Sequence, residues 1–432
     1  MRAKTMPPAQ EQASPVREND SKSEWRAGWP ILLISMIAYG CGMGLFLLSS
    51  SSFIGPIKDA FGWTTGQAAI APISSLTMAI LFPFVGRLID RWGARPFAIG
   101  GLTGLVLCYL ALATCPANIV LYRTLALLIG LCLVACGPIT FSRGVGSWFN
   151  VSRGTALGIL ISGLSLGGVL GIPFANFVIK NYGWRQAYVG LAVIVAVIGL
   201  PLVIAFFRER GGAPSKSSKP ATGNSLGEAL RDSRFWLLLL SFIFAALPIG
   251  VFSNHLVPIL TGRGFPLQEA VSLGAIFAGS IGVARICIGI LVDRLRDYFV
   301  AGTCIMAAGF GAFALFHPTG TYVLLQAKLM ICLLGLAYGA EGDLAAYFTL
   351  KIFGLKAFST IMGCFAATIG LGTSLGGFIG SLVVDQAGGY DPLAPFMAVS
   401  LLISGALMFA QPSFHKARIN RLVARGGSEA RS

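Results

Sequence analysis

The chain has 432 residues, of which 55% are hydrophobic and only 11% are charged, and its mean hydropathy is +0.77. Soluble domains carry about 25% charged residues, so this composition excludes a soluble protein and indicates an integral membrane protein. The formal net charge is +15, but the basic residues lie in short segments between apolar runs. That pattern is typical of membrane topology and of contact with anionic membrane lipids, and it argues against nucleic acid as a partner.

The first segment, residues 1–28, is polar and contains Pro7, Pro8 and Pro15. It has no apolar run of its own, so we predict a disordered cytoplasmic tail and not a cleaved signal peptide. Twelve apolar stretches follow, each close to the 20 residues that cross a bilayer as a helix. They predict spanning helices at residues 29–53, 67–86, 97–115, 119–141, 155–179, 186–207, 235–260, 268–291, 299–317, 322–344, 357–383 and 393–411.

A short charged loop, GRLIDRWGARP, connects the second and third stretches at residues 86–96. Arginine is costly in hydrocarbon and glycine permits a tight turn, so the sequence predicts a cytoplasmic loop. An aspartate among arginines at the end of an apolar helix also predicts an ion pair. We expect a gating charge cluster of Gly86, Arg87, Asp90, Arg91 and Arg95.

The loop recurs half a chain later, because residues 289–294 (GILVDR) repeat residues 86–91 (GRLIDR) at an offset of 203 residues. Further matches follow in order at offsets of 202 to 205, such as Pro56 with Pro258 and Phe149 with Phe353. Two parallel repeats predict two six-helix halves, related by an axis along the membrane normal, with a central site between them. The repeat adds Asp293 and Arg294 to the expected gate.

The basic residues also predict the orientation. With the N-terminus inside, 25 of the 32 Lys and Arg fall on the inner side, four fall outside and three lie within spans. This asymmetry predicts a multi-pass protein of the cell's inner (cytoplasmic) membrane with both termini in the cytoplasm. The expected parts are an N-tail (1–28), an N-terminal bundle (29–207), a cytoplasmic linker (208–234), a C-terminal bundle (235–411) and a cytoplasmic C-tail (412–432).

The charged loop resembles the signature loop of the major facilitator superfamily, which carries glycine, a basic residue, aspartate, arginine and glycine at these spacings. Three more features resemble its monocarboxylate-porter-like branch: Phe61-Gly62-Trp63, the stretch 255–258 (HLVP), and Arg285 eight residues before Asp293. Better-known members of that branch carry an aspartate one turn before this arginine, where the present chain has Ile281. The resemblance implies an all-α membrane protein of twelve transmembrane helices in two pseudo-symmetric six-helix halves.

Arg285 is the strongest candidate for substrate binding, because an ionisable group inside a span is costly and is a functional candidate by default. Its planar guanidinium suits a carboxylate, although a structural ion pair with Glu341 or Asp343 is the alternative. Tyr39, Asn254 and His255 are further candidates for substrate contact. Tyr39 could instead be a packing residue, and His255 could either relay protons or be hydrogen-bonded at a helix interface.

Glu341 and Asp343 flank Gly342 near the inner end of the tenth span, and they point about 200° apart on a helix. One interpretation is a buried proton site. The other, which we favour from the sequence, is a gate latch in which one of these acids pairs with Arg294.

We therefore expect a secondary transporter that carries a small organic anion, a monocarboxylate by resemblance, by alternating access in symport with a proton. The alternatives are a multidrug-type exporter of neutral or cationic compounds and a non-transporting membrane sensor. An enzyme is not expected, because the sequence has no nucleophile–base pair and no phosphate loop. No cofactor or metal site is expected either, because the nine cysteines stand singly, without metal-ligand spacing.

Overall fold

The computed structural model describes residues 15–210, 223–316, 323–387 and 389–429. Within these ranges the chain is helical, and its single β-bridge joins Gly223 to Gly354. The first half comprises α1 (Pro15–Tyr39), α2 (Leu45–Ser49), α3 (Ile54–Phe61), α4 (Thr65–Ala68), α5 (Ala71–Trp92), α6 (Ala94–Ala113), α7 (Ile119–Ala135), α8 (Pro138–Gly146), α9 (Arg153–Tyr182), α10 (Trp184–Ile194) and α11 (Leu200–Phe206). The second comprises α12 (Leu226–Leu230), α13 (Ser233–Gly262), α14 (Leu267–Arg294), α15 (Asp297–Phe316), α16 (Val323–Phe348), α17 (Phe358–Ala387) and α18 (Leu393–Glu429).

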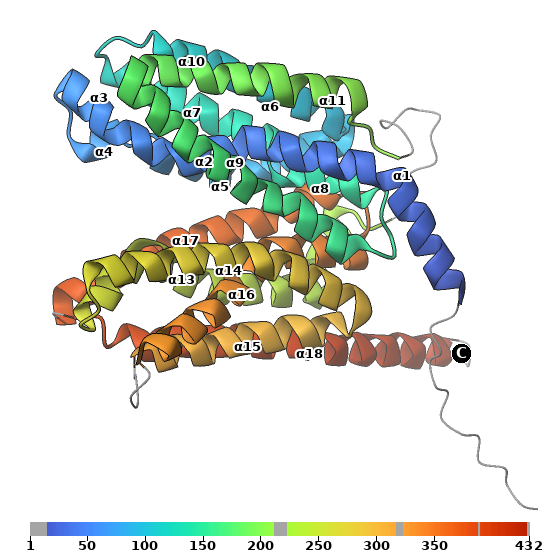
Figure 1. Ribbon diagram of the computed structural model, residues 1–432. Helices are drawn as coiled ribbons and strands as arrows, with labels where there is room; N and C mark the ends of the chain where they lie inside the picture. The colour runs from blue at the N-terminus through green and yellow to red at the C-terminus, as the bar shows by residue number, and fades with distance from the viewer. Residues whose placement is uncertain (1–14, 211–222, 317–322, 388, 430–432) are drawn as a thin grey trace, which may run out of the picture.

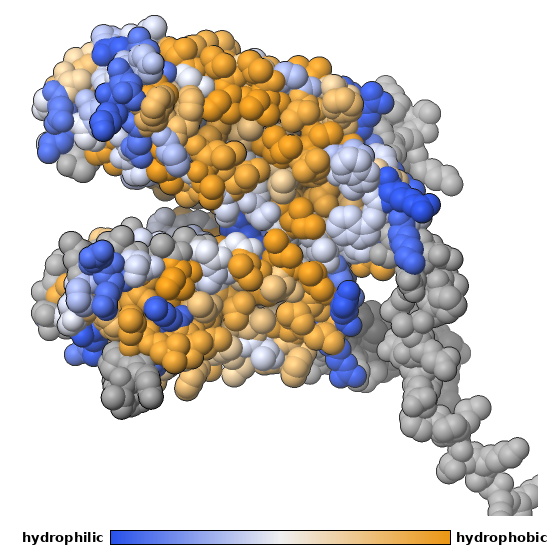
Figure 2. All heavy atoms as spheres, in the orientation of Figure 1, coloured by the Kyte–Doolittle hydropathy of each residue, from blue (hydrophilic) through white to orange (hydrophobic). Residues whose placement is uncertain are grey.

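The described residues contain twelve helical segments long and apolar enough to cross a membrane, which confirms the number predicted from hydropathy. Short π-helical or 3₁₀ turns join some consecutive labels into one span, as in Lys22–Phe61, which runs from α1 to α3. Large apolar side chains such as Phe84, Val169 and Phe310 are exposed on these helices. Figure 2 shows a broad apolar band between more polar ends, as expected for a surface that faces lipid.

The two halves form separate bundles, blue to green and yellow to red in Figure 1. They diverge at the end that carries α3, α4 and the α13–α14 turn, which we call the open end. They converge at the other end, the closed end, where α1 begins, α8 lies and α18 finishes. Figure 2 shows the resulting cleft between the halves, which narrows toward the closed end. Any ligand of the central region therefore enters from the open end in this conformation.

The N-terminal segment differs from its prediction, because α1 begins at Pro15 and residues 15–28 are helical rather than disordered. Tertiary contacts explain the difference. The Trp25 ring lies edge-on against Phe149 with centroids 5.1 Å apart. Gly28 also packs against Phe149, since an added Cβ would lie 2.7 Å from the ring. The expected disorder of residues 1–14 lies outside the described residues.

Glycine sets the closest helix contacts within each bundle. A Cβ at Gly167 of α9 would overlap the Gly40 carbonyl oxygen beside α1, and one at Gly250 of α13 would overlap the Thr373 carbonyl oxygen of α17. These contacts relate the first spanning helix to the fifth and the seventh to the eleventh, so the same packing occurs in both halves. Small residues allow such close backbone approach in a membrane, where helices gain nothing from excluding water.

This packing predicts that Gly167→Ala lowers the melting temperature of the purified protein in detergent. The new methyl group overlaps a neighbouring backbone, and overpacking costs about 1–3 kcal/mol. Gly100→Ala on α6 is the matched control, because nothing lies within 4 Å of its would-be Cβ. There, alanine improves helix propensity by about 0.5–1 kcal/mol, so the melting temperature is unchanged or slightly higher. Equal shifts in both variants would contradict this account of the packing.

Candidate functional site

The first connection between the halves at the closed end is made by Asp90, in the last turn of α5. Its carboxylate accepts hydrogen bonds from the Ser359 amide (2.9 Å), the Thr360 amide (2.8 Å) and the Thr360 hydroxyl (2.6 Å). These groups form the first turn of α17, in the other half. The first amides of a helix have no partner within it and carry a partial positive charge, so a carboxylate is well suited to them.

The second connection repeats the first with the halves exchanged. Asp293, at the end of α14, accepts hydrogen bonds from the Gly154 amide, the Thr155 amide and the Thr155 hydroxyl, each 2.8 Å long. We call the Asp90 and Asp293 contacts the closed-end lock. Gly86 and Gly289 make this geometry possible, because a Cβ on either would overlap the backbone of the opposing helix. The repeated sequence thus corresponds to a repeated contact between halves.

Arg143, on α8, is the buried ion-pair partner of Asp90, with Nη1 2.5 Å from Oδ1. The same guanidinium reaches the Glu209 carboxylate at 3.4 Å and donates to the Leu355 carbonyl at 3.1 Å. Glu209 also accepts a hydrogen bond from the Ala94 amide at the start of α6. A buried arginine is costly unless its donors are satisfied, and here three acceptors from three segments satisfy them.

The sequence analysis missed Arg143 and Glu209, because it ended the fourth span at residue 141 and began the linker at 208. Both residues were treated as loop charges. The available signal was the pattern Pro138 to Gly146, where proline starts a new helical turn and carries Arg143 back into the protein.

The ion pair predicted for Asp90 exists, but its partner is not one of the loop arginines. Arg87 and Arg91 are exposed, and Arg91 lies over the Trp92 ring at 5.9 Å. Arg95 donates from Nη2 to the Ile204 carbonyl at 2.7 Å. Of the loop arginines, Arg95 therefore contacts its own half, and Arg87 and Arg91 lie at the surface. The arginine that reaches the lock is Arg143, on α8.

Arg285 lies on α14 between the lock and the cleft, and only 8% of its surface is exposed. Its Nη1 donates to the Ile161 carbonyl of α9 at 2.8 Å, so it spans the two halves. Its backbone also abuts Gly158, where an added Cβ would lie 2.5 Å from the Arg285 carbonyl oxygen. The Nε atom is buried without a hydrogen-bond partner. A fixed cation with an unused donor therefore lies in the central region.

Two ionisable side chains, one from each half, interact with this arginine, and a third lies on a neighbouring helix. Tyr39, at the end of α1, interacts electrostatically with Arg285 and Asp343, and it packs edge-on against Phe141. Asp343 is 5% exposed, and neither of its carboxylate oxygens has a hydrogen-bond partner. Glu341 is 6% exposed, with Oε1 unpartnered. The structure thus brings together Tyr39, Arg285 and Asp343, with Glu341 on the same helix as Asp343.

Close packing of α16 on α14 explains why Asp343 reaches Arg285. A Cβ at Gly335 would overlap Ser280, and one at Gly339 would lie 2.7 Å from both Ala284 Cβ and the Ile281 carbonyl oxygen. One helical turn beyond Gly339 is Asp343, and one turn beyond Ile281 is Arg285. An acid from α16 therefore interacts with the arginine of α14.

The predicted latch between Arg294 and Glu341 or Asp343 is wrong for this conformation. Arg294 is exposed, and no ion pair or hydrogen bond joins it to either acid among the described residues. The physical reason is depth, because both acids are buried within the protein rather than at the surface, and Asp343 interacts with Arg285 instead. The lock at this end is formed by Asp293 with backbone amides instead.

His255 does not add to the central cluster. His255 Nε2 lies 3.3 Å from the Gly377 carbonyl oxygen of α17, and its ring is 5.8 Å from Tyr390. A Cβ at Gly380 would lie 2.9 Å from the same ring. This is the interfacial histidine that the sequence left open as an alternative. The side chain of Asn254 lies outside the described residues.

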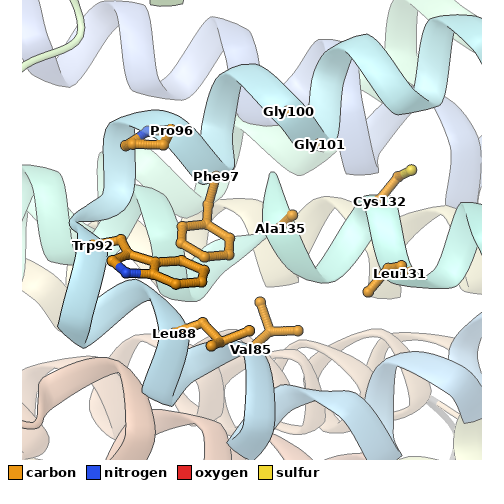
Figure 3. A pocket seen from close by; sticks show the side chains of 10 residues that line it. All are labelled: Val85, Leu88, Trp92, Pro96, Phe97, Gly100, Gly101, Leu131, Cys132 and Ala135. Carbon is orange, nitrogen blue, oxygen red and sulfur yellow. The ribbon is translucent and has the colours of Figure 1, made fainter.

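A groove of about 370 Å³ lies between α5, α6 and α7, close to the charged loop (Figure 3). It is lined by apolar side chains such as Leu88, Phe97 and Leu131, together with the Trp92 ring and glycines. Leu88 and Trp92 are exposed on the outer surface of the bundle. The groove offers no charged group to a polar solute, so the central cluster is the better candidate site.

The sequence matches the family model of the Major Facilitator Superfamily over residues 31–360, about three quarters of the chain. It is 26% identical over 273 residues to the uncharacterized MFS-type transporter YcxA of Bacillus subtilis, covering 62% of this chain and 66% of that protein. It is 29% identical over 174 residues to monocarboxylate transporter 2 of Rattus norvegicus, covering 39% and 34%. The fold is similar to that of the E. coli fucose:proton symporter FucP, with a TM-score of 0.66 at 16% identity over 90% of this chain and 99% of that one.

The lock geometry predicts the effect of Asp90→Asn. An amide has one acceptor oxygen in place of two and no charge for Arg143, so the contact between α5 and α17 weakens. We expect faster reaction of a cysteine placed at Ser359, which is fully buried at this contact, with a polar maleimide. Asp59→Asn, on the exposed α3 at the open end, is the control and leaves the rate unchanged. Equal rates in the two variants would exclude Asp90 from the lock.

Proposed function

Because the chain belongs to the Major Facilitator Superfamily, we propose that it is a secondary active transporter of a small organic anion, a monocarboxylate, coupled to protons. By the positive-inside rule, the closed end lies in the cytoplasm together with both termini, and the cell's inner membrane is the site of action. In this orientation the conformation is outward-facing. Opening of the closed-end lock with closure of the cleft then completes alternating access.

The observation that supports an anionic substrate is the state of Arg285. It is buried where the two halves meet, and one of its donors has no partner. A carboxylate that leaves water loses its hydration, and a fixed guanidinium offsets this loss with two parallel hydrogen bonds. The hydrogen bond from Nη1 to the Ile161 carbonyl restrains the orientation of the guanidinium.

Charge balance in the site supports proton coupling. Arg285 interacts with the Asp343 carboxylate, and a second buried acid, Glu341, lies on the same helix, so binding of a further anion is unfavourable while both acids are ionised. A proton on the acid nearest the arginine frees Arg285 for the substrate. Release of the proton on the other side restores the attraction between Asp343 and Arg285 and expels the anion. This order makes uptake electroneutral and dependent on the pH gradient.

The two acids also support a second candidate function, the export of a cationic compound. Glu341 and Asp343 are buried with unpartnered oxygens, and either carboxylate would offset the charge of a bound cation. The two candidates differ in the residue that is indispensable. Anion transport requires Arg285, whereas export of a cation requires the acids and tolerates loss of the arginine.

Substitution of Arg285 is the direct test of an anionic substrate. Arg285→Lys keeps the charge and loses the planar pair of donors, so affinity for the substrate falls by about 1–3 kcal/mol. Arg285→Ala abolishes uptake. The measurement is uptake of labelled C2–C6 carboxylates into proteoliposomes with an inward proton gradient. Arg123→Ala is the control, because Arg123 is exposed on α7, away from the cluster. Uptake by Arg285→Ala with an unchanged Michaelis constant would refute the anion proposal.

Substitution of Asp343 tests the coupling. Asp343→Asn mimics a permanently protonated acid, so uptake driven by a proton gradient falls at least tenfold, while exchange of substrate at equal pH persists. Exchange needs no net proton movement, which is why the two modes separate. Glu341→Gln distinguishes the two acids, and Asp59→Asn is the surface control. If gradient-driven uptake survives in both Asp343→Asn and Glu341→Gln, neither acid carries the proton.

A further inference from the structure

The N-terminal helix contributes a carboxylate to the segment that precedes α9. Glu24, four residues before Gly28 on α1, accepts hydrogen bonds from three consecutive amides of residues 150–152. Its Oε1 binds the Asn150 amide at 3.0 Å and the Val151 amide at 3.2 Å. Its Oε2 binds the Val151 amide at 3.0 Å and the Ser152 amide at 3.4 Å. One side chain thus fixes the whole approach to α9.

The same helix start receives Asp293 from the other half. Glu24 occupies the amides of residues 150–152, and Asp293 occupies those of Gly154 and Thr155. Arg153 lies between them in sequence, interacts electrostatically with both carboxylates, and donates to the Phe149 carbonyl at 2.8 Å. Because Arg153 lies beside both acids, it offsets the repulsion between them.

We infer that Glu24 is a positioning residue of the closed-end lock, which holds the start of α9 in the geometry that Asp293 requires. The two carboxylates differ in one respect, because Glu24 belongs to the same half as α9 and Asp293 to the opposite half. When the halves separate at the closed end, Asp293 must leave and Glu24 remains. Glu24 therefore keeps the amides of residues 154–155 pre-organised for the return of Asp293, which lowers the entropic cost of closing.

Without the Glu24 carboxylate, the amides of residues 150–152 lose their hydrogen-bond acceptor. The ring contact between Trp25 and Phe149 is then a weaker remaining link between α1 and this segment. The start of α9 then samples other conformations, and the Asp293 contact becomes less favourable. The closed end opens more often as a result. This inference rests on alternating access in the proposed function, but it does not depend on the identity of the substrate or on the coupling ion.

The test uses the full-length protein in nanodiscs, where both faces are accessible, with Ser359→Cys as the reporter. Ser359 lies on α17, in the Asp90 contact of the lock. It is fully buried and its hydroxyl makes no hydrogen bond, so a cysteine at this position does not disturb α9. Cys287, the exposed one of the nine cysteines, is replaced by serine throughout. The measured quantity is the rate of reaction with a polar maleimide.

We expect Glu24→Ala to raise this rate at least threefold. Glu24→Gln raises it in the same direction, because its amide nitrogen cannot accept a hydrogen bond from Val151 or Ser152. Asp59→Ala is the control, since Asp59 is exposed on α3 at the open end, away from both contacts of the lock. We expect the maleimide reaction rate of this control to equal that of the parent protein.

A double variant separates positioning from a general loss of stability. Glu24 and Asp293 act on the same helix start, so Glu24→Ala combined with Asp293→Ala raises the rate no further than Asp293→Ala alone. Melting temperatures measured in parallel show that all variants are folded, and Glu24→Gln serves if Glu24→Ala is not. If Asp293→Ala raises the rate while both Glu24 variants leave it unchanged or lower it, the inference is wrong. Loss of anion uptake in Arg285→Ala has no bearing on this result.

Discussion

The conformation depends on one repeated interaction, a carboxylate from one half that accepts hydrogen bonds from the first amides of a helix in the other half. Asp90 makes it with α17 and Asp293 makes it with α9, through the same set of two amides and one threonine hydroxyl. Such bonds are strong because one partner is charged, yet they need no matching side-chain cation. They can therefore break and re-form as rigid bodies rock, provided that both surfaces keep their shape. The glycines opposite each helix start supply that shape, since any side chain there would hold the halves apart.

The lock also determines where the central cluster lies. Asp293 fixes the end of α14 against α9, and Arg285, about two turns earlier, is thereby held against the Ile161 carbonyl of the same helix. Closure at one end thus positions the arginine that faces the cleft at the other. Glycines on α16 then bring Asp343 to the same place from a different helix. Asp293 and Arg285 thus lie on one helix, α14, so a displacement of its closed end moves the arginine as well.

The sequence predicted the twelve spans, the two halves and the repeated glycine and aspartate motifs, and it offered an acid from the tenth span as an alternative partner for Arg285. These follow from periodic or repeated signals that are carried by consecutive residues.

Three features were not predictable in this way. Arg143 and Glu209 were assigned to loops because hydropathy places span ends within a few residues only, and the buried ion pair depends on those residues. The Arg294 latch was wrong because the depth of Glu341 and Asp343 follows from helix packing. The helical N-terminal segment was read as disordered because its composition is polar, and its order comes from contacts with residues 149–152, more than 100 positions away.

The two contacts of the closed-end lock, made by Asp90 and by Asp293, are alike in geometry but not in electrostatics. Asp90 is neutralised by Arg143, whereas the residue at the equivalent repeat position, 204 residues later, is Tyr347. The Tyr347 hydroxyl donates to the Val292 carbonyl at 3.3 Å and supplies no charge. Among the described residues, Asp293 forms no ion pair, so its hydrogen bonds come from two amides and the threonine hydroxyl at the start of α9, with Arg153 nearby but not paired with it. An anion held by hydrogen bonds from a helix start is more sensitive to the exact placement of those donors than one that also has a salt bridge. The Glu24 carboxylate, which lies outside the repeat, supports this second contact, and the N-terminal helix extends beyond the membrane span to supply it.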